Sequence, residues 1–163
     1  MDKIEHLNTV IREQGLQLGE FDPKTGMSVS MAGTVPLYMY AGPDNIMFFM
    51  GVTTIDERIL QQKPDLYREL LIAGSLGGDF GNVRIVLDAA TDMLWLCRSA
   101  AIEPSELKDE AADFSEQAAP LRRILLKQML SDDYEPPNAV SQIAAAEEFA
   151  AQPAGALLGW LQI

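Results

Sequence analysis

Residue types that could do chemistry are few in this chain. The sequence contains a single cysteine, Cys97, and a single histidine, His6. These counts exclude an intrachain disulfide framework and a zinc site built from several cysteines, and they disfavour a nucleophile–histidine triad. Cys97 falls within an apolar strand pattern, so we interpret it as a buried structural thiol. His6 stands on the expected surface of a helix, without a nucleophile motif near it in sequence, and we assign it no catalytic role.

Acidic clusters at 109–113 and 132–135 are the remaining candidates for a metal site. Neither cluster has the spacing of a calcium-binding loop, so solvated acidic surface is the favoured interpretation. The glycine-rich stretch 74–81 follows an expected helix and precedes an expected strand, which is the reverse of the order in a phosphate-binding loop. We interpret it as a helix stop. The sequence therefore predicts no cofactor, no metal and no enzymatic activity.

Charge and length limit the classes of partner. The chain has 163 residues, 48% of them hydrophobic, which is enough for one domain with a buried core. Asp and Glu number 24 against 12 Lys and Arg, a formal net charge of −12. Nucleic acids and anionic membranes attract cationic surfaces, so neither is expected as a partner. No apolar run approaches the ~18 residues of a membrane span, and no membrane insertion is expected.

The elements that position these residues follow from hydrophobic periodicity. Residues 2–15 have helical spacing, with Asp2 as a cap, and residues 64–76 predict a second helix. A third helical region spans 104–130, where Pro120 is expected to kink or split it. Alternation of apolar and polar residues predicts strands at the following positions: 27–31, 35–40, 46–50, 83–88 and 93–98.

These elements predict an α+β fold in the order α-β-β-β-α-β-β-α. Short connections between the first three strands and between the last two require antiparallel pairing, so we expect a twisted antiparallel sheet flanked by helices, mainly on one face. The domain is expected to span 1–130. Residues 131–163 contain five acids and neither Lys nor Arg, and they are interpreted as an acidic and apolar C-terminal extension with helical character.

Methionine is unusually frequent in the first three strands. Five of the eight methionines lie there. Methionine is flexible and polarizable, and it is common on adaptable binding surfaces, but it also fills cores. Core filling is the favoured interpretation, and a binding surface remains the alternative.

The order of elements resembles the class I type III secretion chaperones, the CesT/Tir chaperone family. The resemblance covers about residues 2–130 and is a pattern of elements and turns. It rests on the opening helix, the strands 27–40 and 46–51, the helix 66–76 running into Gly77-Gly78, the strands 83–88 and 93–98, and the helix 107–130. Pro120 and the extension 131–163 depart from the family pattern.

The resemblance implies a homodimer in the bacterial cytoplasm that uses neither ATP nor a cofactor. Such a protein binds the N-terminal region of a secreted effector, here called the client, and holds it extended and competent for secretion. We expect the client to lie along the first helix and first strands, to add to a sheet edge and to fill apolar pockets. The candidate partner-binding residues are Leu7, Ile11, Val29, Met31, Leu37, Met39 and Phe48, of which about half are expected to be core instead.

A homodimer is also expected because the second helix and the last two strands carry an excess of apolar residues. The candidate interface residues are Leu71, Ile72, Leu94, Trp95 and Leu96. Two alternatives stay open. The first is an interaction or regulatory protein of the same fold without a secretion client. The second, less favoured, is a small metal-dependent hydrolase that uses the acidic clusters.

Overall fold

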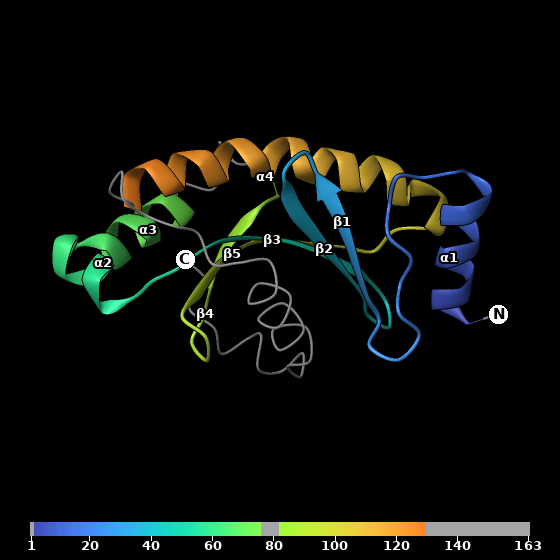
Figure 1. Cartoon of the computed structure of the whole chain (residues 1–163), viewed down its shortest axis with the longest axis horizontal. Helices are drawn as coiled ribbons and strands as arrows, with labels where there is room; N and C mark the ends of the chain where they lie inside the picture. Colours follow the sequence, from blue (N-terminus) through green and yellow to red (C-terminus); the bar gives the residue numbers. More distant parts are fainter. Residues whose placement is uncertain (1, 76–81, 130–163) are drawn as a thin grey trace.

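The computed structural model describes residues 2–75 and 82–129 (Figure 1). Side chains 71–75, 128 and 129 are also outside the description, as are the glycine-rich stretch beyond residue 75 and the whole extension 131–163. The elements are α1 (Lys3–Glu13), β1 (Met27–Ala32), β2 (Val35–Ala41), β3 (Ile46–Thr54), α2 (Glu57–Gln62), α3 (Leu66–Ser75), β4 (Arg84–Asp88), β5 (Met93–Ala100), a 3-10 turn η1 (Pro104–Glu106) and α4 (Leu107–Met129).

The predicted element order is confirmed, with one short helix added. Helix α2 was not expected, because six residues carry too little periodicity to stand out in sequence. Its start is stabilised locally, since the Asp56 carboxylate accepts a hydrogen bond from the Ile59 N–H at 3.0 Å. Asp2 stands at the N-cap of α1 as expected, but its side chain makes no capping hydrogen bond.

A five-stranded antiparallel sheet in the order β1-β2-β3-β5-β4 forms the centre of the fold. This confirms the predicted sheet. The β2–β3 turn is held by Lys3, whose Nζ donates to the carbonyl oxygens of Gly42 at 2.7 Å and Asn45 at 3.1 Å. Strands β1 and β4 lie at the two edges of the sheet, and each has one side that faces no other described strand.

All four described helices pack on the same face of this sheet. Leu7 and Ile11 of α1, and Phe114 of α4, join one buried cluster with Phe48 of β3. Helices α2 and α3 contribute to the same cluster at the other end of the sheet through Ile59, Leu66 and Leu70. Figure 1 shows α4 running along the sheet, with α1 near its start and α3 near its end. We call this side the helix face.

The opposite side of the sheet, which we call the open face, carries a second buried cluster. Its described members are all strand residues: Met27, Tyr38, Phe49, Val86, Met93, Trp95 and Cys97. Cys97 is therefore buried, as predicted. The methionines of the first three strands are not all core residues. Met27, Met39 and Met50 are buried, whereas Met31 is exposed.

Helix α4 is continuous through Pro120, so of the two expected outcomes the split is wrong, while the kink stays a prediction. Proline removes one backbone donor from the helix. Here Pro120 is exposed, while its neighbours Ala118 and Leu121 are buried in the core of the helix face. Packing on both sides of the proline outweighs the loss of one hydrogen bond.

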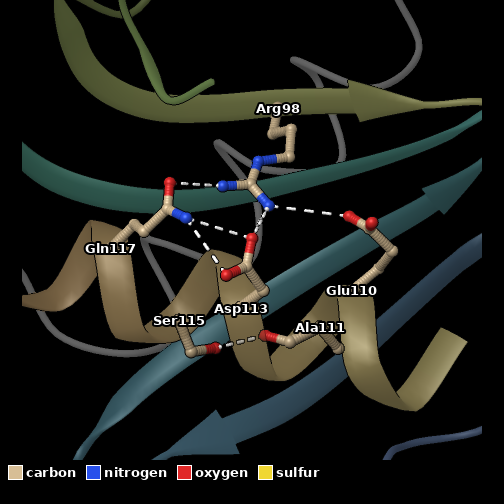
Figure 2. A network of polar contacts seen from close by, with 6 residues as sticks. All are labelled: Arg98, Glu110, Ala111, Asp113, Ser115 and Gln117. Carbon is tan, nitrogen blue, oxygen red and sulfur yellow. Dashed lines mark hydrogen bonds and ion pairs between the residues drawn. The ribbon is translucent and has the colours of Figure 1, made fainter. Parts of the chain in front are cut away.

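A buried arginine joins α4 to β5 (Figure 2). Arg98 Nη1 donates to Asp113 Oδ2 at 2.6 Å and lies 3.5 Å from Glu110 Oε2, and Nη2 donates to Gln117 Oε1 at 2.6 Å. Its guanidinium carbon is 5.8 Å from the centre of the Phe114 ring. Glu110 and Asp113 of the first acidic cluster therefore neutralise a buried cation.

We predict that Asp113→Asn makes the free energy of unfolding depend less on pH in the acidic range. The hydrogen bond from Arg98 holds the pKa of Asp113 below its ordinary value. A lowered folded pKa stabilises the native state above the unfolded pKa of about 3.9, and that stabilisation is lost as the pH falls through the folded value. Urea denaturation from pH 7 downward should show the variant less stable than the wild type at neutral pH, with the difference closing at low pH.

Asp109→Asn is the matched control, because it removes the same charge from the exposed side of the same helix. It should keep the acid dependence of the wild type. Identical curves for the two variants would contradict a stabilising role for the Arg98–Asp113 contact.

Candidate functional site

The edge strand β1 presents backbone hydrogen-bonding groups away from the sheet. The Met27 carbonyl accepts from the Asp22 N–H at 2.7 Å on the side away from β2. Backbone groups alternate in direction along an antiparallel strand, so those of Val29 and Met31 point the same way. An extended peptide can pair with such groups by strand addition.

The segment that follows α1 runs beside β1 and covers part of this edge. The Ser28 hydroxyl donates to the Gly19 carbonyl at 2.5 Å, and the Gly19 N–H donates to the Ser30 hydroxyl at 2.9 Å. Gly19 lies so close to the Val29 carbonyl that a Cβ atom there would overlap it. The two serines thus act in place of backbone partners, which explains why they are buried.

Buried Asn8 holds the same segment to α1. Its side-chain amide donates to the Phe21 carbonyl at 2.8 Å and accepts from the Phe21 N–H at 2.7 Å. These are the two bonds that a neighbouring strand would make. Residues 14–18, which precede Gly19, and the end of β1 line opposite sides of a groove.

The groove has a volume of about 350 Å³ and lies between the end of α1, the end of β1 and the start of α4. Its walls come from three regions distant in sequence. The lining residues are Gln14, Gly15, Leu16, Gln17, Leu18, Ser30, Met31, Ala32, Leu37, Lys108, Ala111, Ala112 and Ser115.

The lining suits an extended peptide with apolar side chains. Leucine, alanine and methionine side chains form most of the surface, and the amides of Gln14 and Gln17 can donate and accept hydrogen bonds. The exposed Lys108 ammonium is the charged group of the lining, and it favours a carboxylate nearby. These groups can bind and orient a chain through contacts and hydrogen bonds.

The structure places the predicted partner-binding residues in two classes. Val29 and Met31 are exposed, at 41% and 60% of their full surface. The other candidates are buried in the core of the helix face: Leu7, Ile11, Leu37, Met39 and Phe48. Leu37 also lines the groove. In this conformation, Val29 and Met31 are the two candidates whose side chains a client could contact. Contact between a client and any of the seven candidates stays a prediction.

The predicted dimer-interface residues are also separated by the fold. Leu94 and Leu96 are buried on the helix face, and Trp95 is buried on the open face. The side chains of Leu71 and Ile72 lie outside the described residues. Dimer contact through this set stays a prediction.

Several groove residues were not singled out from the sequence. Leu16 and Leu18 flank Gln17 just after the helix stop at Gly15, and that alternation is the signal that could have identified them. Ala112 and Lys108 carry no comparable signal, because small or charged residues on a helix surface are ordinary.

Within the described residues, His, Cys, Asp and Glu side chains form no group of three that could hold a metal ion. Among the described helices, none is both long and apolar enough to cross a bilayer.

We predict that Gly19→Ala destabilises the wall of the groove. The new Cβ would overlap the Val29 carbonyl, and the segment would have to move away from β1, at a cost of about 1–3 kcal/mol. The midpoint of urea denaturation measures the loss. Glu20→Ala, which removes one partner of an exposed 3.7 Å ion pair with Arg12, is the control and should cost no more than about 0.5 kcal/mol. Equal midpoints for the two variants would contradict the close contact.

Comparison with known proteins identifies the fold. No protein-family model matches the sequence, and no curated protein does. A chain in the HopA1–SchA chaperone–effector complex is 17% identical, with a TM-score of 0.52 over 73% of this chain and 91% of that chain. A chain in the heterodimeric ExoU–SpcU complex from the type III secretion system of Pseudomonas aeruginosa is 15% identical, with a TM-score of 0.51 over 72% of this chain and 95% of that one. The chain therefore has the α+β fold of proteins found in chaperone–effector and type III secretion complexes, which confirms the fold expected from the sequence resemblance.

Proposed function

We propose that this protein is a type III secretion chaperone that binds an extended segment of an effector without turnover. The observation that carries the proposal is the groove beside the outward edge of β1. It occurs on a fold shared with chains of a chaperone–effector complex and a type III secretion complex. Bacterial cytoplasm as the location is part of the same proposal.

The client segment pairs with the outward backbone groups at Met31, beyond the part of the β1 edge that Gly19 and Asp22 cover. Strand addition supplies affinity that depends little on sequence, because it uses backbone groups. Alternate side chains of the added strand then point toward the groove or away from it. A side chain that enters the groove contacts Leu16, Leu18 and Ala112.

The same geometry explains how the client stays extended. A segment paired along a strand edge cannot form helical hydrogen bonds with itself, because its backbone groups are already used. Its apolar side chains are held in the groove and withheld from other apolar surfaces. The net charge of −12 keeps the complex soluble through mutual repulsion.

Met31→Asp should weaken client binding by about tenfold to a hundredfold, because it places a carboxylate at the edge where an apolar segment docks. The side chain is exposed, so the fold should persist. Ile124→Asp is the matched control, since Ile124 is an exposed apolar residue, at 49%, on α4 away from the groove. Titration calorimetry with the purified client measures both affinities.

The client for this test is the product of a neighbouring gene that forms a soluble complex when co-expressed with the chain. Equal affinities for the two variants would place the client elsewhere on the molecule. If no neighbouring product forms a complex, the alternative of a same-fold regulatory protein is favoured. Stabilisation by added divalent metal would instead favour the hydrolase alternative.

We also propose a homodimer, with contact at α3 and the adjoining edge strand β4. Among the described strands, none pairs with the outer edge of β4, so its backbone groups can pair with a partner. Light scattering at micromolar concentration should report about twice the chain mass of 17.9 kDa. A mass of one chain that does not change with concentration would contradict the dimer.

A further inference from the structure

The open face of the sheet is buried although no described helix covers it. At its centre, Tyr38, Phe49 and Trp95 have none of their surface exposed. They come from the neighbouring strands β2, β3 and β5. The described residues of α1, α2, α3 and α4 that join a core cluster all pack on the helix face.

These three aromatic side chains form a single contacting layer. The ring centres of Tyr38 and Phe49 are 5.5 Å apart, and the Trp95 ring packs edge-on, 5.9 Å from Tyr38 and 5.6 Å from Phe49. One layer of side chains on a sheet cannot shield its own outer side from water. Complete burial therefore requires a second layer over the face.

The Tyr38 phenol indicates that this second layer is apolar. Its Oη is buried and has no hydrogen-bond partner among the residues that the structure describes. Burial raises the pKa of Tyr38 to about 12, since the phenolate would lose its hydration. Polar side chains over this group would offer it a hydrogen bond.

We propose that the C-terminal residues 130–163 of the same chain cover the open face. Burial within one chain requires a cover from that chain, and this is the longest part of it outside the described residues. The segment continues directly from α4, which ends at Met129. Thirty-four residues are long enough to cross a five-stranded sheet.

The composition of the segment suits this face. It carries Val140, Ile143, Phe149, Leu157, Leu158, Trp160 and Leu161, which supply apolar surface for the aromatic layer. Its five acidic residues are not balanced by any Lys or Arg. Arg84 of β4 is exposed and pairs across strands with Cys97, so it stands on the open face as a cation at the margin.

This inference does not depend on the proposed function, because it concerns burial within one chain. A second copy of the chain is the other candidate occupant. Trp95, one of the predicted dimer-interface residues, lies on the open face. A dimer partner that used this residue would therefore compete with the C-terminal segment for the open face.

Cys97 is a natural probe of the face, because it is the single cysteine and lies beside Phe49 across strands. In the full chain carrying Ile143→Asp and Phe149→Asp, alkylation of Cys97 should become about tenfold faster or more, since labelling follows the fraction of chains whose cover is open. Ser141→Asp with Gln152→Asp is the control, with the same added charge and no apolar residue lost. Circular dichroism confirms that both variants keep the fold.

Crosslinking tests the same contact with the C-terminal segment unchanged. Tyr40 is half-buried at the margin of the open face, and p-benzoylphenylalanine at that position should crosslink to residues 130–163 of its own chain. The same probe at Asp109, exposed near the start of α4 and 21 residues before the segment, is the control and should not. Intermolecular crosslinks from position 40, or Cys97 labelling equal in the two double variants, would overturn the proposal.

Discussion

The central strands β3 and β5 carry apolar side chains on both faces, and this constraint underlies the rest of the structure. In β5, Leu94 and Leu96 point to one side, and Trp95 and Cys97 to the other. A sheet of this kind is stable in water when both faces are covered. The four described helices cover one face. The need for a second cover leads to the proposed role of the C-terminal segment.

Helix α4 is the element on which the helix face depends. Phe114 packs on Phe48, and Arg98 brings a cation into the interior, where Asp113 and Gln117 bind it. A buried charge is costly unless it is paired, so the guanidinium holds α4 at one position along β5. Arg122 adds a second tie, since its Nε donates to the Gly51 carbonyl of β3 at 2.8 Å, where the β3–β5 register shifts. The same placement of α4 positions Ala112 and Lys108 at the groove.

The edges of the sheet are treated differently from its centre. At β1, serine side chains and Gly19 cover part of the outward backbone, and the groove begins where this cover ends. Exposed edges are sites of unwanted strand pairing, and proteins normally protect them. An edge that is partly protected and partly bordered by an apolar groove has room for the extended segment that the proposed function requires.

The sequence alone determined the element types, their order and the antiparallel pairing, because periodicity and short turns are local properties. It could not assign Leu37, Met39 and Phe48 to core or to surface. Apolar residues occur on both faces of these strands, so the alternation does not show which face is buried. Nor could it predict the buried position of Arg98, because the carboxylates that neutralise it lie on a helix later in the chain. The groove likewise depends on tertiary structure. Its walls, Leu16, Met31 and Ala112, are distant in sequence, and they meet because one hydrophobic core packs α1, β1 and α4 together.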